Sequence, residues 1–365
     1  MTTISLPAGA MLRPLELPAR ADAAPSPLIR EYAAARNQSI LESTGRDDDA
    51  LSAEALLPML FSTPDCERLR WAVLVDDQVI GCCSIDLLRD EDGQTARATV
   101  AVLDSHAGRG IGSAAFAHLE SVARAAGIRK ILTWAEHHDD GTGRESLTPP
   151  TGFGSVPSDR SARFLVRHGF TLEQVERVSA LTWDAQTLAH LDALYDDAAA
   201  HAADYRIVQW SAPTPPEHAD GFAWLKSRMS TDAPDADLGS PEEVWDATRV
   251  AQQEERVLIR GWSMQITAAQ HTGTGELCAF NELAIGTDPS ETTHQWDTLV
   301  LREHRGHRLG MLVKTAGLRS WHARYPASSR VVTYNAEENR PMLSINEAIG
   351  FTPVAYEGAW KKELR

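Results

Sequence analysis

The stretch His304-Arg305-Gly306-His307-Arg308-Leu309-Gly310 follows an apolar run at residues 298–301 and precedes a helix-like run at 311–316. Basic and glycine residues between a strand and a helix are typical of a phosphate-binding turn. The unpaired N–H groups at a helix N-terminus attract anions, and glycine lets an anion approach the backbone closely. A solvated strand–helix turn is the alternative interpretation of this stretch.

The same pattern occurs a second time upstream. His106-Ala107-Gly108-Arg109-Gly110-Ile111-Gly112 follows an apolar run at 99–103 and precedes another helical run. We call residues 106–112 and 304–310 the first and second glycine turns. Each is followed later by a helix that ends in Gly-Phe, at Gly169-Phe170 and Gly350-Phe351. Two landmarks that recur in the same order predict a duplicated domain.

Composition limits the class of protein. The 365 residues suffice for two domains, and 43% hydrophobic with 24% charged residues is globular composition. The net charge of −16 argues against nucleic-acid binding, because a phosphate backbone requires a basic face. It is compatible with an amine substrate. We also expect no membrane association, and a monomer or homodimer.

Cysteine usage and the N-terminus give further expectations. Cys66, Cys82, Cys83 and Cys278 show no metal-ligand spacing, so we expect no metal, and Cys82-Cys83 look like buried thiols. His137-His138 with Asp139-Asp140 favour a solvated loop over a metal site. No signal peptide or long apolar span is found, which predicts a cytoplasmic protein.

Periodicity and capping residues predict the elements. Helices are expected at 26–43, 50–61, 113–126, 184–203, 218–228, 241–255 and 342–349, with Ser52 and Ser240 as N-caps. Strands are expected at 71–75, 78–85, 97–103, 131–134, 172–183, 205–210, 262–268, 276–283, 295–301 and 330–334. We expect an insertion at 138–157, and tryptophans 224, 245, 262, 296 and 321 mostly in the core, although one could line an amine pocket.

These elements give a division into domains. Residues 1–10 are expected to be a flexible tail, 11–185 an N-terminal domain, 186–204 a linker helix, and 205–365 a C-terminal domain. The fold class is α/β with a mixed sheet in each domain.

The order of strands and the two glycine turns resemble the GCN5-related N-acetyltransferase (GNAT) superfamily, in its tandem form. The resemblance implies acetyl-CoA as co-substrate, with the pyrophosphate in a turn of pattern Arg/Gln-x-x-Gly-x-Gly. Arg305 and Gly310 match the ends of this pattern in the second copy, where Arg308 replaces the middle glycine. Gly110 and Gly112 match in the first copy, where Ala107 replaces the leading residue.

The resemblance also implies where acetyl-CoA would bind. Residues expected to contact it in the second copy are Thr298, Leu299, Val300, Arg305, Gly306, His307, Arg308, Leu309, Gly310 and Asn339. Those expected in the first copy are Val100, Ala101, Val102, Arg109, Gly110, Ile111 and Gly112. The strand residues would offer backbone groups to the acetyl and pantetheine arm.

Three residues of the second copy are candidates for catalysis. Glu282 aligns with Ser84 of the first copy and could remove a proton from an ammonium; a salt-bridged Glu is the alternative. Glu338 lies at the end of a strand, where it could serve function or a helix N-terminus. Asn346 stands four residues before Gly350. The GNAT family commonly has at this position a Tyr that serves as the general acid, and Leu165 occupies it in the first copy.

The sequence therefore predicts an N-acetyltransferase that moves the acetyl group of acetyl-CoA to a primary amine of a small molecule or peptide. Transfer would occur by direct attack in a ternary complex, with catalysis in the C-terminal copy. A non-catalytic acyl-CoA-binding module is the alternative, because the usual Tyr is missing from both copies. Activity of both copies on different substrates is a third possibility.

Overall fold

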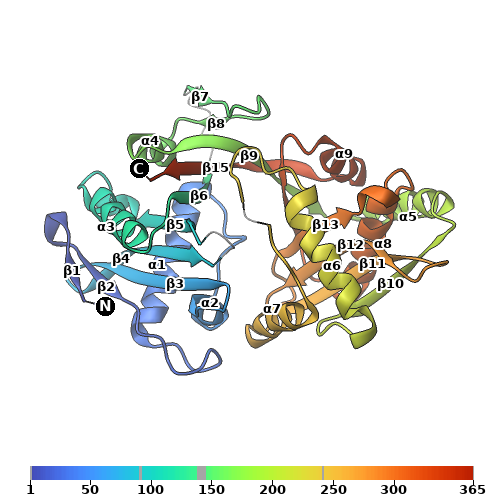
Figure 1. Cartoon of the computed structure of the whole chain (residues 1–365), viewed down its shortest axis with the longest axis horizontal. Helices are drawn as coiled ribbons and strands as arrows, with labels where there is room; N and C mark the ends of the chain where they lie inside the picture. Colours follow the sequence, from blue (N-terminus) through green and yellow to red (C-terminus); the bar gives the residue numbers. More distant parts are fainter. Residues whose placement is uncertain (1, 90–92, 138–144, 241, 365) are drawn as a thin grey trace. The chain divides into compact units, whose positions relative to one another are not determined.

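The computed structural model describes residues 2–89, 93–137, 145–240 and 242–364. Contacts divide the chain into two compact units (Figure 1). The first unit comprises Met1–Val175, Ala236–Gly239 and Ala355–Arg365, and the second comprises Glu176–Asp235 and Ser240–Val354. Neither unit is a single continuous piece of chain, which differs from the expected boundaries.

The first unit is built on a mixed sheet with strand order β1-β2-β3-β4-β5-β6-β15. Only β5 and β6 run parallel; the other neighbours are antiparallel. The strands are β1 (Ile4–Ser5), β2 (Met11–Pro14), β3 (Cys66–Val75), β4 (Gln78–Leu88), β5 (Thr95–Val102), β6 (Lys130–His137) and β15 (Thr352–Glu363). A separate pair is formed by β7 (Ser146–Leu147) and β8 (Val156–Pro157).

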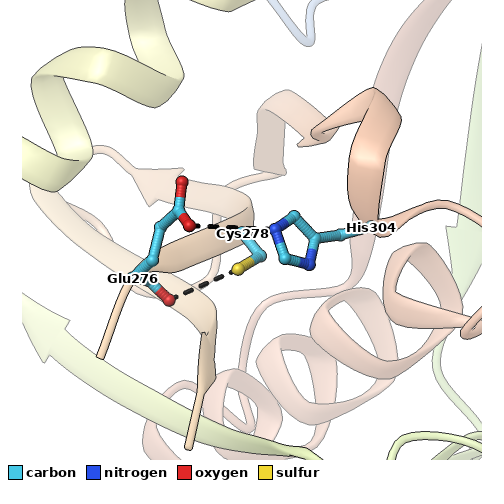
Figure 2. Close-up of side chains that lie close together, drawn as sticks. All are labelled: Glu276, Cys278 and His304. Carbon is cyan, nitrogen blue, oxygen red and sulfur yellow. Dashed lines mark hydrogen bonds and ion pairs between the residues drawn. The ribbon is translucent and has the colours of Figure 1, made fainter. Parts of the chain in front are cut away.

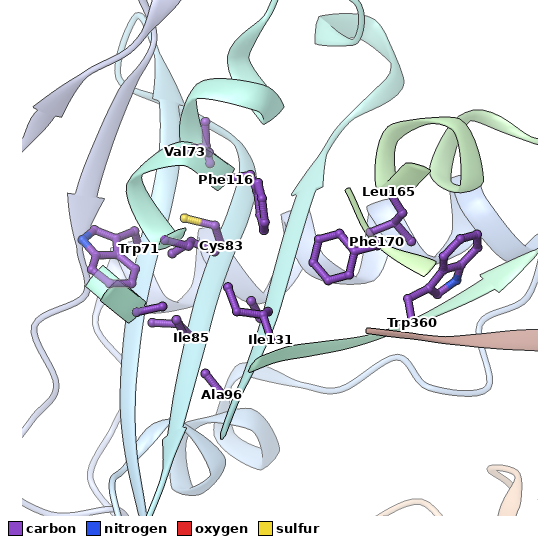
Figure 3. Close-up of a cluster of buried hydrophobic side chains, with 14 of the residues drawn as sticks. Trp71, Val73, Cys83, Ile85, Ala96, Phe116, Ile131, Leu165, Phe170 and Trp360 are labelled. Carbon is purple, nitrogen blue, oxygen red and sulfur yellow. The ribbon is translucent and has the colours of Figure 1, made fainter. Parts of the chain in front are cut away.

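Helices α1 (Pro27–Thr44), α2 (Ala53–Leu60), α3 (Ile111–Ala125) and α4 (Arg160–Arg167) complete the first unit. The apolar faces of α3 and α4 meet the sheet in a buried cluster that includes Trp71, Phe116 and Trp360 (Figure 3), whereas α1 and α2 pack against the sheet in a second cluster. Trp360 comes from β15, so the last strand of the chain supplies part of this core.

The second unit repeats this plan with strand order β9-β14-β13-β12-β11-β10, in which only β13 and β14 run parallel. The strands are β9 (Thr171–Thr182), β10 (Tyr205–Ser211), β11 (Ser263–His271), β12 (Leu277–Ile285), β13 (Thr293–Val300) and β14 (Arg330–Ala336). The helices are α5 (Ala185–Ala200), α6 (Pro216–Asp232), α7 (Ala247–Ile259), α8 (Leu309–Arg324) and α9 (Arg340–Ile349). The expected linker helix is thus α5, which packs within the second unit.

The final strands of the two copies are exchanged. β9 follows α4 of the first copy, yet its residues 176–182 pair with β14. β15 follows α9 of the second copy, yet its residues 356–363 pair with β6. Each copy therefore supplies the strand that completes the sheet of the other unit, a reciprocal exchange that sequence repeats do not reveal.

Local sequence explains most helix starts. Ser26, Ser52, Asp159 and Asp184 each accept a hydrogen bond from the backbone N–H three residues later, as N-caps do. The expected helix at 241–255 is wrong at its start. Asp246 is the cap, α7 begins at Ala247, and residues 242–246 are not helical.

The expected N-terminal tail is also wrong. Ile4 and Ser5 form β1, which pairs with Leu12 and Met11 of β2. Pro7–Gly9 form a short 3-10 turn, and Ile4 and Leu6 pack against the core of the first unit. Apolar residues at alternate positions anchor this segment, so its place at the N-terminus was a poor guide to its order.

Candidate functional site

The two glycine turns have the same backbone path. A short 3-10 turn, Asp104–His106 or Arg302–His304, leads into each one. Gly108 and Gly306 have φ of 73° and 91°, and the residues at the N-cap positions of α3 and α8, Gly110 and Arg308, have φ of 80° and 55°. Arg308 therefore adopts the left-handed conformation that favours glycine, which is why its replacement of glycine preserves the turn.

The helices after these turns lack side-chain caps. Neither Gly110 nor Arg308 caps the N-terminus of its helix, whereas α1, α2, α4, α5, α7 and α9 all have a capping side chain. First-turn N–H groups without a cap are the feature that an anion binds. Both units thus fit the pyrophosphate of acetyl-CoA at this point.

The basic side chains of the second glycine turn already have partners. Arg305 donates from Nε to the carbonyl of Val300 at 3.2 Å, and its Nη2 lies 3.6 Å from Asp232. Arg308 forms an ion pair with Asp197 of α5. These contacts orient Arg305 and Arg308 toward protein groups, so the backbone and the exposed His307 are the groups left facing outward.

The parallel strands of each unit separate as they approach the glycine turn. β13 pairs with β14 only from Thr293 to Gln295, and β5 pairs with β6 only from Thr95 to Arg97. The later residues of β13 and β5 pair with β12 and β4 on their other edge. The gap places the backbone of 298–300 and 100–102, the predicted acetyl-CoA contacts, along an edge without a neighbouring strand in the described part of the chain.

Buried polar atoms lie beside the gap in the second unit. Both amide atoms of Gln295, the last paired residue of β13, are buried without a hydrogen-bond partner. Asn346 of α9 donates to Asn335 Oδ1 at 2.6 Å, while its own Oδ1 is buried and unpaired. Native proteins rarely leave such atoms unpaired, so these residues fit a polar ligand between β13 and β14.

A β-bulge distinguishes the second unit from the first. Asn281 pairs with Thr298 and Leu283 pairs with Gln295, so two residues of β13, Trp296 and Asp297, oppose the single residue Glu282. The equivalent strands of the first unit pair without a bulge, and Ser84 faces Thr99 there. The extra residue turns Asp297 toward Glu282, and bulges commonly redirect side chains near functional sites.

Glu282, Asp297 and Lys226 of α6 form a charged group that we call the Lys226 cluster. Lys226 Nζ lies 2.7 Å from Asp297 Oδ2 and 3.2 Å from Glu282 Oε1. Glu282 is completely buried, whereas 38% of the Asp297 side chain is exposed. Asp297 is thus the member of the cluster that solvent reaches.

Burial raises the pKa of the Glu282 carboxyl to about 7, although the ammonium of Lys226 opposes this shift. Burial lowers the pKa of Lys226, but Asp297 and Glu282 outweigh it and raise that pKa overall. Glu282 therefore titrates near neutral pH beside a lysine that stays charged. A carboxyl poised near the working pH is suited to accept a proton.

Aromatic rings surround the Lys226 cluster. Lys226 Nζ lies 5.0 Å from the ring centroid of Trp245 and 5.9 Å from that of Phe280. Trp296, the other bulge residue, stacks on Trp262 at 6.1 Å between centroids. Of the tryptophans expected in the core, Trp321 and Trp262 are buried, but Trp224 is 52% exposed, because its position on α6 faces outward.

The other candidates of the second unit lie at the start of α9. Asn339 accepts a hydrogen bond from the backbone N–H of Met342 at 3.4 Å, so it caps the helix. Glu337 forms a bidentate ion pair with Arg177. Glu338 is half-buried in this turn, and the catalytic role assigned to it from sequence stays a prediction.

The described residues of the first unit contain no equivalent of the Lys226 cluster. Ser84 replaces Glu282, and Cys82 and Cys83 are buried thiols whose pKa values burial raises, to about 11 for Cys82. His137 is buried and bonded to Asp159 at 3.0 Å, so it is not the solvated loop residue expected. Residues 138–140, the rest of that motif, lie outside the described part of the chain.

Sequence reasoning identified Glu282 but missed Lys226 and Asp297. Lys226 stands on α6 among Phe222, Ala223 and Leu225, all buried, so a lysine in an apolar helix face was the available signal. Nothing in the sequence marks the bulge that redirects Asp297.

Comparisons with known proteins agree with this geometry. Residues 35–144 match the model of the acetyltransferase (GNAT) family. A tandem GNAT protein from the clavulanic acid biosynthesis pathway has a similar structure, with 24% identity over 97% of this chain and 98% of that chain and a TM-score of 0.73. A GCN5-related N-acetyltransferase from Sphaerobacter thermophilus shares 15% identity over 99% and 98% of the two chains, with a TM-score of 0.60. A comparison with curated proteins gives no match.

The predicted fold class is therefore confirmed: each unit has an α/β fold with a mixed sheet, and the chain shares its fold with a tandem GNAT protein. The match of residues 35–144 to the GNAT family model agrees with the predicted resemblance. The family match over residues 35–144 supports acyltransferase activity. None of the helices in the described residues has the length and apolar character needed to span a bilayer.

Proposed function

We propose that the second unit transfers the acetyl group of acetyl-CoA to a primary amine of a small molecule or peptide. The observation that carries this proposal is the bulge in β13, which brings Asp297 to the buried Glu282 where β13 leaves β14. Acetyl-CoA supplies the activated acetyl thioester. The protein must hold it, hold the amine and remove a proton.

The backbone of the second glycine turn and the free edge of β13 are suited to hold acetyl-CoA. The uncapped N-terminus of α8 would take the pyrophosphate, and residues 298–300 would offer backbone groups to the arm. Gln295 and Asn346 add unpaired amide atoms beside the gap.

The surroundings of Lys226 support an amine acceptor. The ammonium of Lys226 is held by two carboxylates and lies over the ring of Trp245. Carboxylates and an aromatic ring are also the groups that recognise a substrate ammonium. Asp297 is partly exposed and so is positioned to meet such a group.

The cluster also offers a route for the proton. An ammonium is not a nucleophile until it loses a proton, and Asp297 is placed to accept that proton. Lys226 then takes it from Asp297 while donating one of its own to Glu282, 3.2 Å away. The proton ends on Glu282, and Lys226 regains its charge.

The test is an acceptor screen with the full chain. Acetyl-CoA is incubated with small amines and peptides, while mass spectrometry follows the acetylated product and a thiol reagent follows released CoA. Equal amounts of acetylated amine and CoA support the proposal. Binding of acetyl-CoA without product from any amine favours the non-catalytic alternative.

For the first unit we propose acyl-CoA binding without turnover. It has the uncapped α3 and the parted strands, but Ser84 and Thr99 stand where the second unit has Glu282 and its bulge. The Pro7 side chain also lies beside Gly110, so the N-terminal segment borders this turn. Calorimetry with acetyl-CoA tests this: two binding sites per chain support it, and one site contradicts it.

A further inference from the structure

Three metal-ligating side chains that do not belong to the Lys226 cluster meet beside the second glycine turn. Glu276 directly precedes β12, Cys278 is the second residue of that strand, and His304 ends the 3-10 turn (Figure 2). One ligand atom from each lies within 4.8 Å of the others. We propose that these residues bind a divalent zinc-like cation.

The backbone fixes the relative positions of the three residues. Leu301 N–H donates to the carbonyl of Cys278 at 2.9 Å, and His304 N–H donates to the carbonyl of Leu301 at 2.9 Å. The backbone carbonyl of Glu276 accepts a hydrogen bond from Cys278 Sγ at 3.3 Å, which holds the thiol beside Glu276. The ligand set is therefore built on paired backbone.

The imidazole of His304 is oriented for a metal. Tyr205 OH lies 2.9 Å from its Nδ1, while Nε2 faces Glu276 at 3.9 Å. A partner on one ring nitrogen that leaves the other for the metal is the usual arrangement of zinc-bound histidine. Tyr205 is thus a positioning residue, which acts through His304.

The donor types select the cation. A thiolate with an imidazole favours zinc and other soft divalent ions over magnesium or calcium. A tetrahedral site places ligand atoms about 3.5 Å apart, so the half-exposed Glu276 side chain has only a short distance to close. Solvent would supply the fourth ligand.

Binding requires a thiolate. The Cys278 S–H bond breaks, its proton passes to solvent, and sulfur forms the bond to the cation. The expectation from sequence spacing that the chain lacks a metal site is revised by this proposal.

The first unit provides a matched control. His106 ends the equivalent 3-10 turn, and Leu103 N–H donates to Ile80 as Leu301 does to Cys278. Ile80 is apolar, and Gln78 stands where the second unit has Glu276. The first unit therefore has the same frame without the ligands.

The experiment uses full-length protein freed of metal by a chelating resin. Cobalt is added as a spectroscopic probe, and zinc affinity is measured by calorimetry. One cation per chain and a thiolate-to-cobalt charge-transfer band are expected. Cys278→Ser should abolish the band, His304→Gln should weaken zinc binding about 100-fold, and Tyr205→Phe should weaken it about 10-fold.

His106→Gln should bind zinc as the wild type does. Circular dichroism checks that every variant is folded. If Cys278→Ser does not fold, His304→Gln still tests the proposal. No stoichiometric zinc binding by the wild type, a charge-transfer band that survives in Cys278→Ser, or equal losses in His304→Gln and His106→Gln would each overturn the proposal.

Discussion

Lys226 Nζ lies 2.7 Å from Asp297 Oδ2, and the bulge in β13 is what brings the two together. The same ammonium lies 3.2 Å from the buried Glu282. Lys226 of α6 thus connects the solvent-exposed carboxylate of Asp297 to the buried carboxylate of Glu282. This connection gives the second unit acid–base chemistry that the first unit lacks.

The pH dependence of turnover follows from this connection. The deprotonated Glu282 accepts the proton, and its pKa is about 7, so kcat/KM should rise with pH to a plateau above that value. Lys226→Met removes both the relay and the charge that lowers this pKa, so kcat/KM should fall and its remaining rise should move to higher pH. A pH–rate profile of each protein measures the shift.

Loss of Lys226 leaves a buried acid without its partner, which costs about 3–5 kcal/mol. The double variant Lys226→Met/Glu282→Gln should recover stability, and thermal melting checks it. A profile of Lys226→Met that superimposes on the wild type, or moves to lower pH, contradicts the proton route.

A reversed charge in each glycine turn should identify the unit that binds the reacting acetyl-CoA. His307→Asp places a negative charge at the uncapped N-terminus of α8 and should raise the KM for acetyl-CoA roughly tenfold. Arg109→Asp is the matched change in the first unit and should leave turnover unaltered. Steady-state kinetics measures both.

An acidic residue at a helix N-terminus is favourable to the helix, so neither variant should lower the melting temperature. A loss of turnover in Arg109→Asp with a normal His307→Asp would assign the reaction to the first unit.

Lys314 should make stability depend on pH. It is buried in α8, and burial lowers its pKa to about 7. Between pH 7 and 10.5 only the unfolded chain takes up this proton, so stability should rise with pH across that window. The shift corresponds to up to about 5 kcal/mol.

Lys314→Met should be more stable than the wild type at pH 7 and should lose this part of the slope. Denaturant unfolding at several pH values measures the free energy of unfolding of both proteins. Titratable groups common to both cancel when the variant is compared with the wild type. The first unit has Phe116 at the equivalent position, 5.4 Å between ring centroids from Phe170, so an apolar side chain fits this fold. Parallel slopes for variant and wild type contradict the prediction.

Arg308 should carry backbone strain. Its φ of 55° is left-handed, a conformation that costs a residue with a Cβ about 1–2 kcal/mol. Arg308→Ala keeps the strain and loses the ion pair with Asp197, whereas Arg308→Gly relieves the strain. Arg308→Gly should therefore be about 1 kcal/mol more stable than Arg308→Ala by denaturant unfolding.

Gly110→Ala is the reciprocal change, since Gly110 has φ of 80° in the first unit, and it should lose about 1 kcal/mol. Equal stability of the two Arg308 variants would show that the turn relaxes out of the left-handed region.

Sequence patterns predicted most of the fold because local rules act within each element. The predicted cap Ser52 begins its helix, the helices expected from Ser26 and Asp184 begin at these residues as caps, and the two glycine turns have one backbone path. The prediction of Ser240 as an N-cap is wrong, because Asp246 caps this helix. Both residue types are favourable N-caps, so residue type alone does not decide which of them begins the helix.

The features that sequence missed depend on long-range pairing. The exchange of β9 and β15 is decided by which sheet edges meet, and the bulge at Trp296 and Asp297 by the register of β13 on β12. Glu282 was identified by comparing the copies. Its partner Lys226 lies 56 residues away on another element, and only the folded chain brings them together.

The most direct test of the central claim is the rate of acetyl transfer to an accepted amine in Glu282→Gln, compared with the wild type and with Ser84→Ala. Glutamine preserves the shape of the side chain but cannot accept the proton, so kcat should fall about 100-fold or more. Ser84→Ala should match the wild type. Undiminished transfer by Glu282→Gln would contradict the assignment of catalysis to Glu282 and to the second unit.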